Sequence, residues 1–250
     1  MTAGTGPVAR AGVATDVGLV REANEDSWFA RGSVFVVADG MGGHAAGEVA
    51  SAIAASTLGE LAHRDDLTVP DLVAAVAEAN RQIVQTAVRN PRQWGMATTL
   101  TGVVLAQADG ARAWVAFNIG DSRVYRYAAR ALTQLTVDHS EVQELVDAGY
   151  LTAEQARVHP LRHTVTRSLG RDRAPVVDTW VLPVEAGEWF LICSDGLTNE
   201  VGDEQIASVL AQAGPDVQAA ADALVRQAVA NGGRDNVTVV IVETVGWFAG

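Results

Sequence analysis

The chain has 250 residues, of which 48% are hydrophobic and 19% charged, and its formal net charge is −12. This length and composition are typical of a globular protein with a sizeable core, so we expect residues 1–250 to form a single domain. Proteins that bind nucleic acid usually present a basic face, so the acidic balance and the lack of a Lys/Arg run exclude nucleic acid as the expected partner.

The predicted elements begin with a β-branched and aromatic run at 34–38, which is typical of a buried strand. Two helical stretches follow. Residues 45–64 are rich in Ala, Leu and Glu, and residues 71–89 have apolar positions at helical spacing. Pro70 favours a helix start just before the second stretch, and Pro91 ends that stretch.

Further strands are predicted at close intervals, with an irregular segment at 138–175. Closely spaced strands permit hairpins and exclude parallel crossovers, so the sheets should be antiparallel. Pairs of helices stand between the blocks of strands, which indicates packed sheets with helices outside. The predicted strands are 98–107, 112–119, 122–127, 132–137, 176–182, 188–193 and 237–242, and the later helices are 141–148, 203–212 and 215–231.

Three of these strands have an aspartate near one end. Asp39 follows the run 34–38, Asp195 follows the strand 188–193, and Asp235 precedes the last strand. Unpaired charges beside a packed core are costly, so these side chains should share a cation. Oxygen ligands select Mg²⁺ or Mn²⁺ over zinc. Two such ions about 4 Å apart would hold a bridging water and lower its pKa, which makes a nucleophile suited to attack on phosphorus.

Each of these pieces also has a plainer interpretation. Asp-Gly is a strong hairpin signal, and the dipeptide at 109–110 is assigned to an ordinary turn. The dipeptides at 39–40 and 195–196 differ because helical sequence follows each of them, and their glycines suggest close approach of the backbone to a ligand. Asp121, taken alone, is a turn residue rather than a ligand. Arg21 could grip two phosphate oxygens with its planar fork, but a single surface arginine is unremarkable.

Six short motifs nevertheless occur in one order along nearly the whole chain. They are 21–26 (REANED), 37–51 (VADGMGGHAAGEVAS), 96–100 (MATTL), 120–123 (GDSR), 194–197 (SDGL) and 233–239 (GRDNVTV). Each motif is modest alone, and the set is highly specific. With these motifs in this order, the chain resembles the metal-dependent serine/threonine phosphatases of the PP2C (PPM) family, in particular the bacterial members.

The resemblance implies an αββα sandwich, an α+β fold in which two antiparallel β-sheets are flanked by α-helices, with a metal site at one end. In the family's pattern Asp39 would bridge two Mn²⁺ or Mg²⁺ ions, and Gly40 would offer its carbonyl oxygen. Asp195 and Asp235 match ligands of the first ion. Asp121, together with Asp195, matches a weaker third metal site of bacterial members.

The resemblance also assigns residues around the ions. Arg21 matches the phosphate-binding arginine. Glu25 and Asp26 match acidic positions that act largely through bound water, and Asn236 is expected to support the ligands. The segment from about 138 to 174 corresponds to the family's flap, which shapes access of the substrate.

The implied reaction is hydrolysis of phosphoserine or phosphothreonine in proteins by a metal-bridging water or hydroxide, without a covalent enzyme intermediate. The implied partners are phosphoproteins made by bacterial serine/threonine kinases, so the chain would act in signalling, and we expect a monomer. The alternative is a catalytically silent module that binds phosphoproteins. Loss of a core ligand would favour that alternative, but Asp39, Asp195 and Asp235 are all present.

The general acid is left open. Animal members of the family have a histidine directly after Asp-Gly, where this chain has Met41, and His44 lies three residues later, as in other bacterial members. The candidates are His44 and a metal-bound water, and a structural role for His44 at a helix start is weighed equally. The other histidines are expected on solvated loops or faces: His63, His139, His159 and His163.

Two further interpretations are weaker. Residues 40–45 fit the dinucleotide fingerprint, but no strand separates the helical stretches 45–64 and 71–89, so the βαβ unit is missing. Asp39 would also repel a pyrophosphate. A nuclease would need a basic run to form its groove, and the sequence has none.

The compartment follows from three features. The lone Cys193 excludes a disulfide framework and fits a reducing environment. Residues 1–18 lack the basic start and apolar block of a signal peptide. No run approaches the roughly 20 apolar residues of a membrane span. We therefore expect a cytoplasmic protein.

Overall fold

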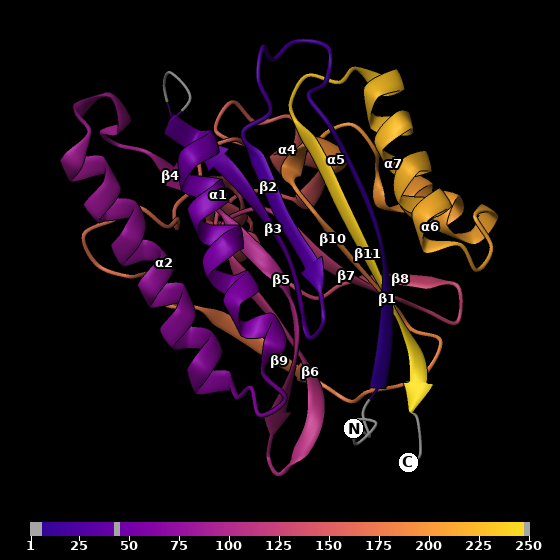
Figure 1. The fold of residues 1–250 in the computed structure, drawn as a ribbon. Coiled ribbons are helices and arrows are strands. Elements are labelled where there is room, and N and C mark those ends of the chain that lie inside the picture. Colours follow the sequence, from indigo (N-terminus) through magenta and orange to yellow (C-terminus); the bar gives the residue numbers. More distant parts are fainter. Residues whose placement is uncertain (1–6, 43–45, 248–250) are drawn as a thin grey trace.

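Two antiparallel β-sheets lie face to face in the computed structural model, which describes residues 7–42 and 46–247 (Figure 1). The first sheet has the strand order β1 (Pro7–Asp16), β11 (Val237–Trp247), β10 (Trp189–Cys193), β7 (Arg123–Ala128) and β8 (Ala131–Gln134). The second has the order β2 (Asp26–Arg31), β3 (Val34–Met41), β5 (Leu100–Ala108), β6 (Ala111–Ile119) and β9 (Asp178–Leu182), and β4 (Ala97–Thr98) pairs with β3.

Helices cover the outer face of each sheet, so the predicted αββα sandwich is confirmed (Figure 1). The second sheet is covered by α1 (Ala46–Gly59) and α2 (Val69–Arg89), and the first by α6 (Asp203–Gln212) and α7 (Val217–Asn231). The shorter helices are α3 (Glu141–Asp147), α4 (Ala153–Arg157) and α5 (Asp195–Thr198), with 3₁₀ turns at Glu60–His63 and Pro91–Gln93.

Apolar side chains fill three layers of this sandwich. Between the sheets, Trp114 packs between Phe35 and Phe190, with ring centroids 5.9 and 5.4 Å apart. The outer layers hold the helices against the sheets, through residues such as Leu72 in α2 and Leu224 in α7. Strand β3 contributes to two of these layers, which explains why its sequence is an almost continuous apolar run. Its ends are therefore fixed by packing on both faces.

The first two strands of the structure were not predicted. Strand β1 contains three Ala together with one Pro, one Gly and one Asp, all of which have low strand propensity. It forms because it pairs with β11 from Pro7↔Trp247 to Asp16↔Val237, a contact between the two ends of the chain. Gly12 lets this strand lie against α7, since a Cβ there would stand 2.3 Å from the Val217 carbonyl oxygen. Such distant pairing leaves no local signal in the sequence.

Helix α4 lies in the segment predicted to be irregular, and the strand predicted at 98–107 is divided into β4 and β5. Other differences concern element ends. The strand predicted at 132–137 stops at Gln134, and the last strand continues beyond 242 to Trp247. The turn predicted at 109–110 is confirmed, with φ of +49° at Asp109 and +81° at Gly110, the conformation that a tight hairpin requires. None of the described helices is both long enough and apolar enough to cross a membrane.

Candidate metal centre

Carboxylates from separate parts of the chain converge at one end of the sandwich. We call this group the acidic cluster and define it as Asp26, Asp39, Asp121, Asp195 and Asp235. Asp26 and Asp39 face each other in the ladder between β2 and β3. The pKa of Asp39 lies well above its ordinary value, first because of burial and then because each of the other four carboxylates repels its negative charge.

The backbone of Asp39 is held by two threonines of the MATTL motif. Its N–H donates to Thr99 Oγ1 at 2.9 Å, and its carbonyl accepts from the Thr99 N–H and from Thr98 Oγ1, both at 2.9 Å. Thr99 Oγ1 also lies 2.8 Å from the Ser122 hydroxyl, beside Asp121. These contacts fix where the Asp39 carboxylate can stand.

The glycines of the two Asp-Gly motifs allow close approach of neighbouring backbone. A Cβ on Gly40 would stand 2.3 Å from the Gly47 carbonyl oxygen in α1 and 2.5 Å from that of Glu25. A Cβ on Gly196 would stand 2.0 Å from the Asn236 carbonyl oxygen. The sequence analysis expected these glycines to approach a ligand, whereas the structure shows them against protein backbone: α1 lies against β3, and α5 lies against the segment before β11.

Burial also raises the pKa of two other members of the cluster, Asp26 and Asp121. Burial raises the pKa of Asp26 to about 7, although the Ser194 hydroxyl donates to its Oδ2 at 2.8 Å. Its Oδ1 is buried and has no hydrogen-bond partner among the described residues. The Asp121 side chain sits where only 8% of the residue is exposed, and burial followed by the charges of Asp195 and Asp138 raises its pKa.

The other predicted residues lie on the rim of the cluster. Arg21 Nη2 donates to Asp235 Oδ2 at 2.7 Å, and the rest of the guanidinium makes no hydrogen bond to the part of the chain that the structure describes. Asn199, which was not predicted, donates from Nδ2 to Asp195 Oδ2 at 2.9 Å. Burial raises the pKa of Glu25 above its ordinary value.

Asn236 joins the loops around the cluster. Its Oδ1 accepts from the Glu25 N–H at 2.8 Å, and its Nδ2 donates to the carbonyls of Val17 and Ala23 at 2.9 Å. This amide therefore fixes the β1–β2 loop, which contains Arg21, against the segment that contains Asp235.

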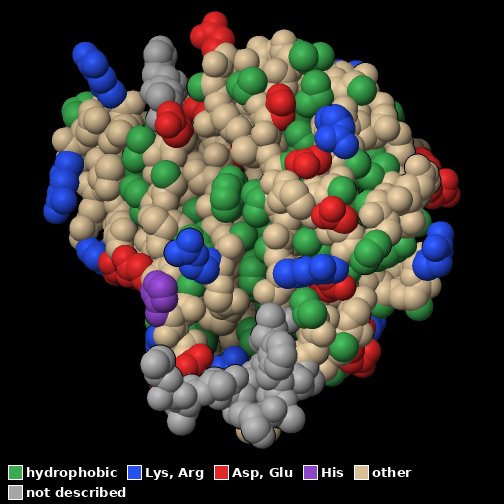
Figure 2. Space-filling model, turned by 45° about the vertical axis from the view of Figure 1, so that its right-hand side comes forward, with side chains coloured by type: hydrophobic (Ala, Val, Ile, Leu, Met, Phe, Trp, Pro, Cys, Tyr) green, Lys and Arg blue, Asp and Glu red, His purple; other side chains and the backbone are tan. Residues whose placement is uncertain are grey.

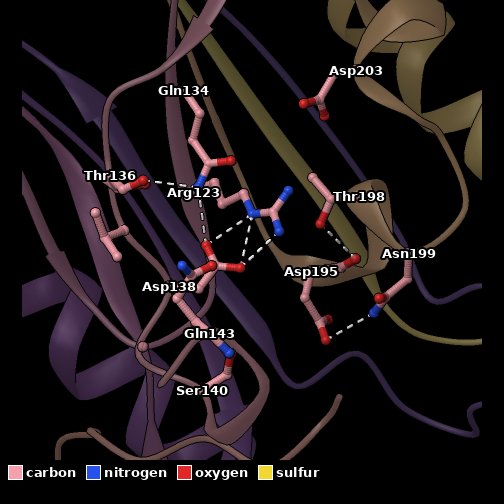
Figure 3. Close-up of polar contacts among 12 residues, drawn as sticks. Arg123, Gln134, Thr136, Asp138, Ser140, Gln143, Asp195, Thr198, Asn199 and Asp203 are labelled. Carbon is pink, nitrogen blue, oxygen red and sulfur yellow. Dashed lines mark hydrogen bonds and ion pairs between the residues drawn. The ribbon is translucent and has the colours of Figure 1, made fainter. Parts of the chain in front are cut away.

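Sequence reasoning missed a partly buried arginine beside the cluster. Arg123 donates to both oxygens of Asp138, at 2.7 Å for the shortest contact (Figure 3). It also donates to the Tyr125 hydroxyl at 2.9 Å. The GDSR motif was interpreted for its aspartate alone, yet its arginine brings a positive charge that lowers the pKa of Asp121 against the larger opposing effects. A charged residue that stands directly before the buried Val124 and Tyr125 at the start of β7 is the signal that could have found it.

The histidine predictions have mixed outcomes. His44 lies outside the described residues. His63 and His163 are exposed and His159 is partly exposed, as expected. The expectation for His139 is wrong: only 7% of it is exposed, and both of its ring nitrogens have partners. Its neighbours Asp138 and Ser140 made the segment look like a solvated loop, and burial by distant residues cannot be seen from that local sequence.

The donor set fits hard divalent cations. The cluster brings five carboxylates together, of which Asp235 pairs with Arg21, and it includes the unpartnered Oδ1 of Asp26. Such a group is costly unless cations or protons neutralise it. Within residues 7–42 and 46–247, no three Asp, Glu, His or Cys side chains already surround one point as ligands. Mg²⁺ usually takes one or two carboxylates and keeps several waters, so it does not need three side chains gathered around one point.

Comparison with known proteins gives the family. A family model described as "Protein phosphatase 2C" matches residues 20–230. The serine/threonine protein phosphatase PstP of Mycobacterium tuberculosis is 41% identical over 249 residues, which cover 97% of this chain and 46% of PstP. The serine/threonine phosphatase Stp of Listeria monocytogenes is 37% identical over 244 residues, which cover 92% of this chain and 93% of Stp.

A solved structure agrees with the fold. The catalytic domain of PstP in complex with two manganese ions superposes with a TM-score of 0.85 and 39% identity, covering 96% of this chain and all of that one. The chain thus spans about half the length of full PstP and all of its solved catalytic domain. The match over residues 20–230 and the likeness to both relatives show that this chain belongs to the protein phosphatase 2C family.

Proposed function

We propose that this chain is a metal-dependent phosphatase that hydrolyses phosphoserine and phosphothreonine in proteins. The observation that carries the proposal is the convergence of the acidic cluster beside Arg21, an arrangement that suits hard cations next to a phosphate-binding group. Two relatives named as serine/threonine phosphatases and the manganese-bound PstP structure support the reaction and the use of two Mn²⁺ or Mg²⁺ ions.

The position of each residue suggests its role in binding the ions. Asp39, Asp195, Asp235 and the Gly40 carbonyl would hold the two ions, and Asp121 with Asp195 would hold a weaker third. When bound, the ions supply Lewis acidity that lowers the pKa of water and offsets phosphoryl charge. Glu25, Asp26 and Asn236 support the ligands around them.

Arg21 would orient the substrate. Its free N–H groups at the rim can donate to two phosphoryl oxygens, while its bond to Asp235 fixes the guanidinium. The donor of the leaving-group proton is a choice between His44, which lies outside the described residues, and a water held at the centre.

The proposed partners are phosphoproteins made by bacterial serine/threonine kinases, met in the cytoplasm by a monomer. On the face drawn in Figure 2, acidic and basic side chains are interspersed, and the described residues of this face form no continuous basic surface. This distribution supports a protein substrate rather than a nucleic acid. Residues 138–174 would form the flap over the site.

The deciding experiment is phosphate release from a phosphothreonine peptide with Mn²⁺, with Mg²⁺ and after chelation. Release that depends on the metal is the expected result. No release under any of the three conditions, from protein shown to be folded, would favour the catalytically silent module that binds phosphoproteins.

Asp121→Ala is expected to raise the Mn²⁺ concentration needed for half-maximal activity by about 10-fold or more, because a buried ligand of the weaker site is removed. Phosphate release measured over a Mn²⁺ titration checks this. Asp65→Ala, which removes an exposed carboxylate outside the acidic cluster and the proposed flap, is the control and should leave the titration unchanged. An Asp121→Ala titration that matches the unmodified chain would reject a functional third site.

Thr99→Val is expected to lower kcat about 10-fold and to cost about 1–3 kcal/mol of stability, because the buried Asp39 N–H loses its acceptor. Thr101→Val is the matched control. Thr101 is equally buried, but its hydroxyl donates to the Phe117 carbonyl, away from the cluster. Thermal unfolding should show similar losses for both variants, whereas kinetics should change only for Thr99→Val. Equal kcat values for the two variants would contradict this role.

A further inference from the structure

The turn that presents Asp121 needs an anchor. Gly120 has φ of +112°, in the region that favours glycine, and a Cβ there would stand 2.5 Å from Thr99 Cγ2. The next residue, Asp121, is buried, and the charges of Asp195 and Asp138 repel its carboxylate. Repulsion and desolvation both favour opening of this turn. Something must therefore hold it closed.

His139 makes hydrogen bonds to both the carbonyl and the N–H of Gly120. Its backbone N–H donates to the Gly120 carbonyl at 2.9 Å, and the Gly120 N–H donates to His139 Nδ1 at 3.0 Å. The backbone contact survives any substitution except proline. The contact to Nδ1 depends on the imidazole.

The His139 ring can make both of its hydrogen bonds in only one tautomer. Nδ1 accepts a hydrogen bond, so it is unprotonated, and the ring proton stands on Nε2, which donates to Asp178 Oδ2 at 3.0 Å. Asp178 is held in turn by Arg167, which donates to its other oxygen at 2.8 Å. Burial lowers the pKa of His139, which agrees with a neutral ring.

We propose that His139 is a positioning residue that holds the Gly120–Asp121 turn and thereby sets the affinity of the weaker, Asp121-dependent metal site. The inference rests on the proposed function only for the identity of the ions. His139 touches neither the substrate nor an ion in this scheme. It acts through the Gly120 N–H, and Asp178 acts through His139 by keeping the proton on Nε2.

Two conservative variants separate the contacts of the ring. In His139→Asn the amide oxygen can take the place of Nδ1, so the acceptor for Gly120 remains and the donor to Asp178 is lost. In His139→Gln the amide nitrogen can take the place of Nε2, so the donor to Asp178 remains and the acceptor for Gly120 is lost. Mn²⁺ binding by calorimetry on the full chain is the readout, with Asp121→Ala as the reference that lacks the weaker step.

His139→Asn is expected to bind Mn²⁺ as the unmodified chain does. His139→Gln should weaken the Asp121-dependent step by about 10-fold or more, as Asp121→Ala does, with similar thermal stability in the two histidine variants. The proposal is overturned if His139→Gln keeps the weaker step, if both variants lose it equally, or if Asp121→Ala leaves the unmodified isotherm unchanged. Phosphate release by the unmodified chain tests the proposed function separately, since binding is measured without substrate.

Asp178→Ala keeps the experiment decisive if His139→Gln does not fold. Without its carboxylate partner the ring also populates the tautomer protonated on Nδ1, which cannot accept from Gly120. The weaker Mn²⁺ step should then lose affinity by several-fold, less than in His139→Gln. An unchanged step in Asp178→Ala would overturn the proposal.

Discussion

Asp39→Asn is expected to lower kcat on the order of 10³-fold, because the carboxylate that would bridge the ions is lost and the ions contribute several kcal/mol to transition-state stabilisation. The same change should make the metal-free protein more stable. Asp39 stands among four other carboxylates that repel it. Asparagine keeps the shape of the side chain and removes its charge, so activity and stability should move in opposite directions.

The stability gain should depend on pH with a definite sign. The folded-state pKa of Asp39 is raised, so the protonated form is favoured by folding. That contribution is fully present below the unfolded pKa of about 4, and it is lost as the pH rises towards and through the folded value. In chelator, the advantage of Asp39→Asn should therefore be small at low pH and grow as the pH is raised to 8. Thermal unfolding checks this, since each kcal/mol corresponds to about 2–4 °C in Tm at this chain length.

The chain contains its own control for this substitution. Asp109 also precedes a glycine, but it lies exposed in the hairpin between β5 and β6. Asp109→Asn makes the same chemical change in a turn that accepts either residue, so neither kcat nor Tm should move. Near-normal kcat in Asp39→Asn would reject its role at the centre, and a lower Tm of that variant in chelator would reject the repulsion argument.

The parts of the fold and site that were predictable share one property: their signal is local. The runs at 34–38 and 188–193 became β3 and β10 because β-branched and aromatic residues fill cores on both faces. Rigid strands then place Asp39 and Asp195 at the same end of the sandwich. The family motifs added Asp26 and Asp121 to the predicted site, although the sequence signal of each residue alone was weak.

The parts that could not be predicted depend on distant partners. Strand β1 exists because β11, at the other end of the chain, pairs with it. His139 is buried because β9 and the Gly120 turn close over a segment whose own sequence is polar. Arg123 is stabilised inside the protein by Asp138 and Tyr125. In each case a tertiary contact determines the structure, and the local sequence alone predicts a different one.

Arg21→Ala is expected to raise KM for a phosphopeptide by about 10–100-fold with a smaller change in kcat. A charge-assisted hydrogen bond contributes about 1.5–3 kcal/mol, and Arg21 would make such bonds to the phosphate in the bound substrate as well as in the transition state. The side chain is 53% exposed and is oriented by one bond to Asp235, so its loss should not disturb the core. Steady-state kinetics at saturating Mn²⁺ give the two constants separately.

Two variants show whether this effect comes from the planar fork or from positive charge alone. Arg21→Lys keeps the charge but cannot donate in parallel to two oxygens, so KM should recover only in part. Arg234→Ala removes a neighbouring arginine that lies beside Asp235 and pairs with Glu200 at 3.0 Å, and it should leave KM unchanged. If instead Arg21→Ala kept KM and lost kcat, Arg21 would act only in the transition state, and phosphate binding in the ground state would have to be assigned to the ions.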